Sequence, residues 1–198
     1  MGDNNNQAVN PGCWILYVFT TVMWMFSMMY LNMFQGDNYL MYGLLLLVSL
    51  PFWIMAAVQY YRCGDMVMGH FYMVFGVLFG GFIAVAYLGP YLGHIFPALA
   101  MDETIMGMLY IAGSLFCLPT VPSFVYMDKV SMVTWTLCTV WLLEGGISYF
   151  FPEAAILYQI SMLLCLVITV GITYMMLNDT CVMCFSKGLP MGKPIKGA

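Results

Sequence analysis

Long apolar runs constrain this chain more than any other feature of its sequence. Six segments each approach or exceed the roughly 20 apolar residues that cross about 30 Å of hydrocarbon as an α-helix. Only 7% of the 198 residues are charged, whereas soluble domains carry about 25%. In hydrocarbon every backbone polar group needs an internal partner, which a helix provides. The sequence therefore predicts an all-α integral membrane protein without a soluble catalytic domain.

Short polar breaks separate the predicted spans. We expect transmembrane helices at residues 12–34, 39–61, 66–88, 104–126, 130–151 and 154–178. A polar N-terminal segment (1–11) precedes this transmembrane domain (12–178), and a polar C-terminal tail (179–198) follows it.

The few basic residues predict the orientation of the chain. An even number of spans puts both termini and the second and fourth loops on one side of the membrane. That side carries all five Lys and Arg residues: Arg62, Lys129, Lys187, Lys193 and Lys196. Because basic residues mark the cytoplasmic side, both termini are predicted to be cytoplasmic. We expect a multi-pass protein of the cell membrane, and an organelle membrane is the alternative.

Composition and motifs exclude several function classes. Five basic residues and no basic patch argue against nucleic-acid binding. The sequence contains no metal, phosphate-loop or Ser/His/Asp motif, so we expect neither a cofactor nor an enzyme. Cys181 and Cys184 alone cannot complete a four-ligand zinc site. Free thiols are the simpler interpretation of this pair, and lipidation next to the membrane is the alternative.

The third span carries two stripes of opposite character. One stripe consists of glycines within about 40° of one another, at roughly 100° per residue: Gly69, Gly76 and Gly80. The Gly-x-x-x-Gly spacing lets helices approach closely, so this stripe predicts a packing face. The other stripe is aromatic and turned away from the glycines: Tyr72, Phe75 and Phe79. It predicts contact with lipid or a neighbouring helix, and a pore lining is the alternative.

Two ionisable residues lie inside predicted spans, where such a side chain is a functional hypothesis by default. His70 sits about one turn inside the boundary and roughly opposite the aromatic stripe, which favours an interfacial histidine with a satisfied hydrogen bond over a proton carrier. Glu144 lies well inside the fifth span and shares a helix face with Leu137, about 10 Å away. Its candidate roles are proton carrier, cation attractor and structural partner of a nearby Tyr or Ser.

Three short patches resemble the acetate uptake transporter family, the bacterial succinate–acetate permeases and their fungal acetate/ammonium relatives. The first family motif, at the first span, is Asn-Pro-Ala-Pro-Leu-Gly-Leu. The second follows the second span and consists of aromatic and basic residues, then Gly-Asn-Thr-Phe, then an aromatic residue followed by Tyr-Gly. The third, near the C-terminus, is Phe-Gly-Arg…Leu-Pro-x-Gly. The residues that stand in these places are Asn10-Pro11, Tyr61-Arg62, Gly64-Asp65, Tyr72, Phe75-Gly76, Phe185, Lys187 and Leu189-Pro190-Met191-Gly192.

The resemblance implies a homo-hexamer with a separate narrow pore through each six-helix subunit. Small carboxylates would pass a hydrophobic constriction formed by residues of the first, third and fifth spans. Carried over to this chain, these residues are Phe19, Phe75 and Leu137, and Phe75 stands where the family has Tyr. Residues expected at the cytoplasmic mouth or in proton coupling are Asn10, Tyr72, His70 and Glu144.

The leading interpretation is a membrane transporter or channel for acetate or a similar small monocarboxylate, with proton symport as one form of it. Its expected partners are the solute, protons, the lipid bilayer and further copies of the chain. Cys13-Trp14-Ile15 replaces the Pro-Leu-Gly of the family signature and Phe75 lacks a hydroxyl, so the path looks dry. A channel for ammonia, ammonium or another small solute is therefore the alternative. A third interpretation is a non-transporting assembly protein whose glycine ridge only builds an oligomer.

Overall fold

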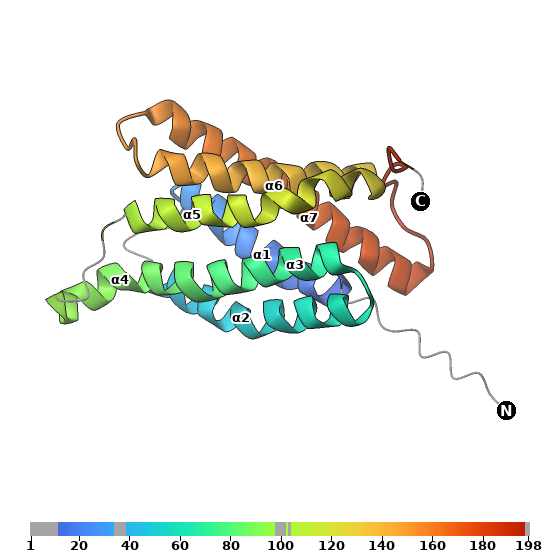
Figure 1. Cartoon of the computed structure of the whole chain (residues 1–198), viewed down its shortest axis with the longest axis horizontal. Coiled ribbons are helices and arrows are strands. Elements are labelled where there is room, and N and C mark those ends of the chain that lie inside the picture. Colours follow the sequence, from blue (N-terminus) through green and yellow to red (C-terminus); the bar gives the residue numbers. More distant parts are fainter. Residues whose placement is uncertain (1–11, 34–38, 98–101, 103, 197–198) are drawn as a thin grey trace.

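The computed structural model describes residues 12–33, 39–97, 102 and 104–196, and the regular structure within these ranges is entirely helical. Figure 1 shows the helices in chain order. They are α1 (Gly12–Tyr30), α2 (Tyr39–Arg62), α3 (Met66–Phe75), the π-helix η1 (Gly76–Ile83), α4 (Ala84–Ile95), α5 (Thr104–Cys117), the 3₁₀-helix η3 (Leu118–Tyr126), α6 (Lys129–Ser148) and α7 (Ala155–Phe185).

Five continuous helical segments are long and apolar enough to cross a membrane: Tyr39–Arg62, Met66–Ile95, Thr104–Tyr126, Lys129–Ser148 and Ala155–Phe185. In α1 the described apolar part is shorter and spans Trp14–Tyr30. Large apolar side chains stay exposed on the outside of the bundle, among them Val48, Leu163 and Val170 at more than 60% exposure. Such an exposed apolar surface is favourable in hydrocarbon and unfavourable in water. The predicted all-helical architecture is confirmed for the described residues.

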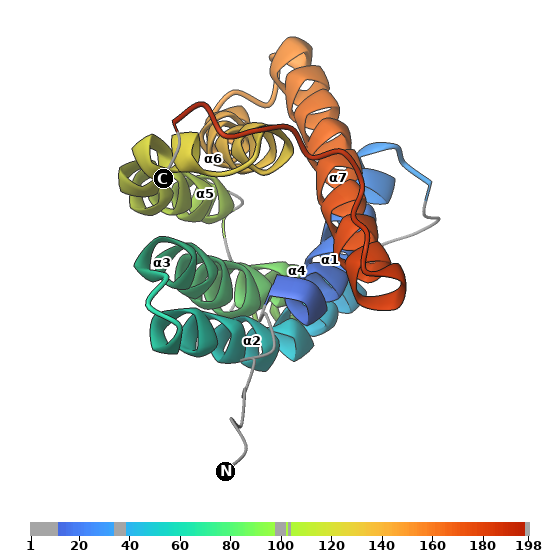
Figure 2. The same ribbon diagram turned by 90° about the vertical axis from the view of Figure 1, so that its right-hand side faces the viewer.

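The helices surround a common axis, as the end-on view in Figure 2 shows. α2 packs along α3, η1 and α4 on one side, and α5 packs along α6 on the other. α7 contacts both α6 and α1, which closes the arrangement. Every helix therefore contributes one face to a shared interior.

The third predicted span continues without a break through α3, η1 and α4, to Ile95 instead of residue 88. The expected loop began at Gly89-Pro90, but Pro90 lies inside α4. The segment around Pro90 is still apolar, and unwinding it there would leave backbone groups without partners. The eight residues of η1 form a π-helix, a rare geometry that frequently occurs at functional sites.

The glycine stripe of this helix packs against α2, as predicted. A Cβ atom built on Gly76 would lie 2.8 Å from the Cβ atom of Trp53, and one on Gly80 would lie 2.7 Å from the Cα atom of Leu50. A Cβ atom on Gly69 would likewise lie 2.6 Å from an aromatic ring of α2. The packing face is confirmed. It lies inside one subunit, so it is not the oligomer-building ridge of the assembly interpretation.

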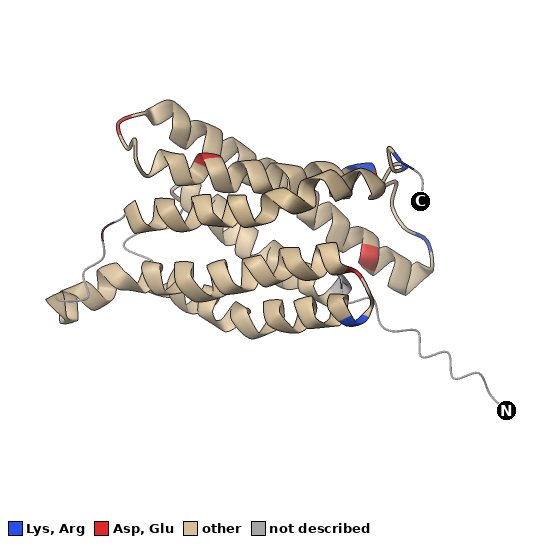
Figure 3. Ribbon diagram, viewed as in Figure 1, with Lys and Arg blue, Asp and Glu red and all other residues tan. Residues whose placement is uncertain are grey.

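Charges are distributed unevenly along the bundle. In Figure 3 all Lys and Arg segments gather at the end of the bundle near the C-terminus, whereas acidic segments occur at both ends. At the basic end α7 runs past residue 178 to Phe185 and so includes Cys181 and Cys184, which are free thiols.

Candidate functional site

Aromatic rings fill the centre of the bundle. Phe19 from α1 meets Phe75 at a centroid distance of 5.0 Å, Trp53 at 4.7 Å and Trp135 at 5.5 Å. The structure therefore brings together two of the three predicted constriction residues, Phe19 and Phe75. We call the complete set the aromatic plug, and each member is at most 2% exposed: Phe19, Phe26, Trp53, Phe71, Phe75, Phe79, Trp135 and Trp141.

The third predicted constriction residue, Leu137, is only half-buried and packs against the edge of the core. The aromatic rings that α6 contributes to the plug are Trp135, which stacks on Phe19, and Trp141, which stacks on Phe79 with planes 14° apart. Sequence reasoning missed both tryptophans. The sequence position of these tryptophans, well inside the fifth predicted span, could have identified them, because Trp in membrane proteins concentrates at the two membrane–water interfaces.

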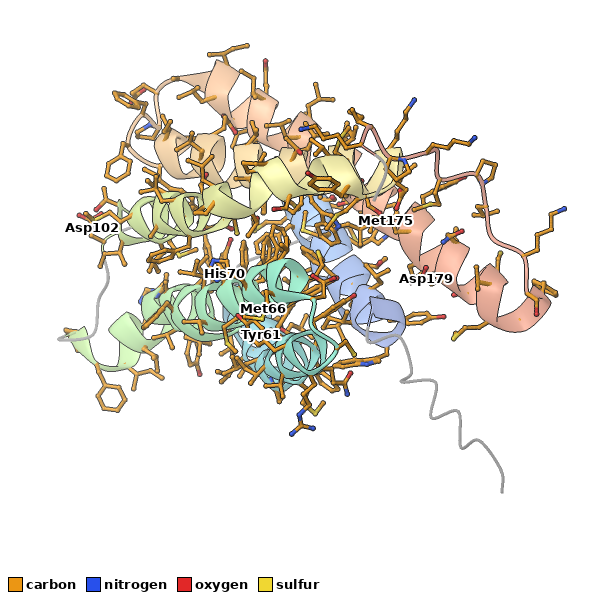
Figure 4. All side chains as sticks on the ribbon, turned by 45° about the vertical axis from the view of Figure 1, so that its right-hand side comes forward. Tyr61, Met66, His70, Asp102, Met175 and Asp179 are labelled. Carbon is orange, nitrogen blue, oxygen red and sulfur yellow. The ribbon has the colours of Figure 1, made fainter. Side chains whose placement is uncertain are left out.

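A cavity of about 340 Å³ opens at the basic end of the bundle, and we call it the acidic vestibule. Three carboxylates line it, and no Lys or Arg does so within the described chain: Asp65, Asp128 and Asp179. Two of these cap helices, because Met68 N–H donates to Asp65 at 3.0 Å and Ser131 N–H donates to Asp128 at 2.9 Å. Figure 4 places Asp179 on α7, one turn beyond Met175.

Tyr72 lies where the acidic vestibule meets the plug. Its ring stacks on Tyr60 at 5.2 Å and contacts Trp53 at 6.0 Å and Trp135 at 6.1 Å. It lines the vestibule although it is only 1% exposed. Tyr72 was expected at the cytoplasmic mouth or in proton coupling, and it lies at the inner end of this vestibule. Asn10, the other mouth residue, falls outside the described residues.

From the end of α7 the C-terminal tail runs back along α7 and across towards α6, as Figure 2 shows. The Tyr174 hydroxyl donates to the Pro190 carbonyl at 3.0 Å, and Val130 N–H donates to the Met191 carbonyl at 3.2 Å. Leu189 N–H donates to Asn178 Oδ1 at 2.8 Å. These bonds tie the tail to both α7 and α6 and place Met191 in the vestibule lining.

A second cavity, of about 370 Å³, opens at the opposite end of the bundle. Tyrosines dominate its lining, so we call it the tyrosine vestibule: Tyr30, Tyr39, Tyr87, Tyr149 and Tyr158. A smaller adjoining cavity of about 50 Å³ includes Asp102. Hydrogen bonds from Thr104 lower the pKa of the Asp102 carboxyl, which keeps this mouth negatively charged.

The two intramembrane ionisable residues lie outside the ring contacts of the plug. His70 is exposed on the side of the bundle, and its Nε2 donates to the Phe116 carbonyl at 2.9 Å. That carbonyl lies where α5 tightens into η3 at Leu118, next to Pro119, which has no N–H to donate. On the face of α6 that meets α7, the Ser161 hydroxyl donates to Glu144 Oε2. Each side chain thus has a structural partner of the kind that the sequence suggested.

The fold is similar to that of a solved channel. The chain superimposes on the bacterial acetate channel SatP with a TM-score of 0.73 over 93% of this chain and 99% of that chain, at 17% sequence identity. At this identity the likeness establishes the fold, which agrees with the resemblance to the acetate uptake transporter family. No protein-family model and no curated protein sequence matches the chain.

Proposed function

We propose that this protein is a multi-pass membrane channel or transporter for acetate or a similar small monocarboxylate. The observation that carries the proposal is an axial sequence of cavity, aromatic plug and cavity within the fold of an acetate channel. Cavities of about 340 and 370 Å³ are large enough for a molecule of this size, and the plug between them is a hydrophobic gate that opens by side-chain movement and wetting.

Six membrane spans with cytoplasmic termini follow from the same reasoning. The gathering of Lys and Arg at one end supports this orientation, and α1 provides the sixth crossing. Assembly as a homo-hexamer and coupling to protons belong to the proposal through the family resemblance. Glu144 is the acidic residue inside a span that is available to handle a proton.

Uptake of labelled acetate into vesicles that contain the purified protein tests the proposal, with and without a pH gradient. We expect uptake above that of empty vesicles and stimulation by an acidic exterior. Protein-containing vesicles that take up neither a short carboxylate nor ammonium contradict the proposal.

The same vesicles test the constriction. Leu137→Ala and Trp135→Ala change the same helix, but Trp135 is buried and its ring contacts Phe19 and Phe71, whereas Leu137 is half-buried. A larger change in uptake for Trp135→Ala assigns the α6 gate to the tryptophan. A larger change for Leu137→Ala supports the residue implied by the family.

A channel for ammonium or ammonia is the second candidate, because three carboxylates line the acidic vestibule. Such a lining attracts cations and repels anions. Inhibition of methylammonium uptake by ammonium, without inhibition by acetate, favours this candidate over the first.

A further inference from the structure

Aromatic rings from separate parts of the chain converge on the tyrosine vestibule. Tyr30 ends α1, Tyr39 begins α2 and Tyr87 lies in α4. Tyr149 directly follows α6, and Tyr158 lies in the first turn of α7. Tyrosines are common at a membrane–water interface, but these five gather around one cavity of about 370 Å³ at the end of the bundle.

The rings stand at an angle to one another and do not form one flat stack. Tyr30 and Tyr158 lie 5.3 Å apart with planes at 59°, and Tyr39 and Tyr87 lie 6.0 Å apart with planes at 28°. The Tyr158 hydroxyl donates to the Tyr30 carbonyl at 3.1 Å, which ties the start of α7 to the end of α1. The face of an aromatic ring carries partial negative charge. Rings at different angles around one space therefore make walls that attract a cation.

Carboxylates add full negative charge to this mouth. Asp102 lines the small adjoining cavity, which shares Tyr39, Tyr87 and Tyr149 with the tyrosine vestibule. The exposed Glu153 lies between two residues of the vestibule lining, 152 and 154. The sequence has no Lys or Arg in the stretches 31–39, 87–104 and 149–158, which hold the connections at this end. The mouth therefore attracts cations through both its rings and its carboxylates.

We propose that the tyrosine vestibule is a binding site for a small quaternary ammonium ion of about the size of choline. Its methyl groups pack against the tyrosine rings, and Asp102 balances its charge. Aromatic cages recognise quaternary ammonium groups in this way. A compact ammonium is strongly hydrated, whereas a nitrogen covered by methyl groups gives up less hydration in such a cage.

This ligand differs from the proposed solute, so its binding does not depend on the proposed function. One consequence does depend on it. A cation in the vestibule covers the route from this end to the plug, so its occupancy should inhibit carboxylate uptake.

Choline and its neutral analogue dimethylbutanol, in which carbon replaces the charged nitrogen, separate attraction of a cation from apolar fit. The thermal unfolding midpoint of the full-length protein measures binding, in a detergent without choline groups and at constant ionic strength. We expect choline to raise the midpoint and to bind at least about fivefold more tightly than the analogue.

Substitutions test the rings and the carboxylate separately. Tyr158 and Tyr39 are 44% and 40% exposed, so leucine at either position should leave the fold intact and weaken choline binding about fivefold. Phenylalanine keeps the ring and should keep most of the affinity. Tyr91→Leu is the matched control, because Tyr91 is 44% exposed in α4 and does not line the vestibule. Asp102→Asn keeps an acceptor for Thr104 N–H and should weaken choline binding mainly at low salt.

The quaternary ammonium group can belong to a free ion or to the headgroup of a choline lipid. Vesicles of phosphatidylethanolamine and phosphatidylglycerol, with and without phosphatidylcholine, distinguish the two sources. In vesicles without phosphatidylcholine, added choline should inhibit acetate uptake by the wild type and Tyr91→Leu, and less by Tyr158→Leu. Equal inhibition after phosphatidylcholine is included indicates the free ion, and loss of the inhibition indicates the lipid headgroup.

Two results overturn the inference. Equal affinities for choline and dimethylbutanol would make the vestibule an apolar pocket without a preference for cations. Loss of affinity in Tyr158→Phe as large as in Tyr158→Leu, together with stronger stabilisation by acetate than by choline, would show that the hydroxyls bind the carboxylate. Failure of the proposed function is a separate result: no carboxylate uptake by the wild type, whatever the midpoints with choline.

Discussion

Replacing Phe75 with alanine removes a ring that four other rings contact. The centroid distances are 4.7 Å to Phe71, 5.0 Å to Phe19, 5.1 Å to Phe79 and 5.8 Å to Trp53. Each such pair contributes about 0.5–1.5 kcal/mol beyond burial, so four pairs amount to about 2–6 kcal/mol. This range includes the cost of about 3–5 kcal/mol typical for Phe→Ala in a core.

The same contacts keep the solute path closed, because a solute passes only when plug rings separate. If opening breaks even one ring pair of Phe75, losing that pair in advance raises the open population about two- to tenfold. We therefore expect Phe75→Ala to lower the thermal unfolding midpoint and to raise solute flux by a similar factor. A change that both destabilises a protein and increases its transport rate is a specific signature of a gate.

Stopped-flow acidification of vesicles by acetic acid measures this flux, and unfolding in detergent measures the midpoint. Phe82→Ala is the control, since Phe82 belongs to the same π-helix but is 58% exposed. Flux within about twofold of wild type, from Phe75→Ala protein that is folded and inserted, would refute the gate. It would show that solute crosses elsewhere or does not cross at all.

Two further substitutions test other parts of the argument. Gly80→Ala should cost about 1–3 kcal/mol of stability, because its Cβ atom would lie 2.7 Å from the Leu50 backbone. Gly81→Ala should leave stability nearly unchanged, because the nearest atom to its Cβ atom would lie 4.0 Å away. Equal thermal unfolding midpoints for the two variants would contradict the packing role of Gly80. His70→Ala should cost about 1–3 kcal/mol by leaving the Phe116 carbonyl unpaired. It should not alter the pH dependence of uptake, and an altered dependence would instead make His70 a proton carrier.

The parts of the fold that could be predicted depend on local sequence. The length of the apolar runs predicted the helices. The spacing of Gly69, Gly76 and Gly80 predicted a packing face, which contacts α2 in the structure. The aromatic stripe of Tyr72, Phe75 and Phe79 on the opposite face could also be recognised, whereas the constriction role of Phe75 was implied only by the family resemblance. These features depend on periodicity within a single helix, which the sequence displays directly.

The features that were missed depend on contacts between distant segments. Trp135 and Trp141 belong to the plug because of how α6 is rotated against α1 and η1, and the nearly uniform hydrophobicity of α6 does not define that rotation. The continuation of α4 through Pro90 follows from its apolar surroundings and not from proline's local preference. The tail of residues 187–196 packs across the vestibule through backbone bonds to other helices, for which side-chain patterns carry no signal.

The charge of the acidic vestibule distinguishes the permeating species, and Asp179 is the residue with which to test it. Asp65 and Asp128 also cap helices, so only Asp179→Asn changes the charge without removing an N-terminal cap.

A unit charge acting over about 8 Å in water contributes about 0.5 kcal/mol, or about twofold in local concentration. If the anion permeates, Asp179→Asn should raise uptake at low salt by about this factor. If ammonium permeates, it should lower uptake by the same factor. Acetate that crosses together with a proton carries no net charge, so under the proton-coupled form of the proposed function we expect unchanged acetate uptake at both low and high salt. A twofold rise that disappears at high salt would show that the anion itself passes the carboxylates.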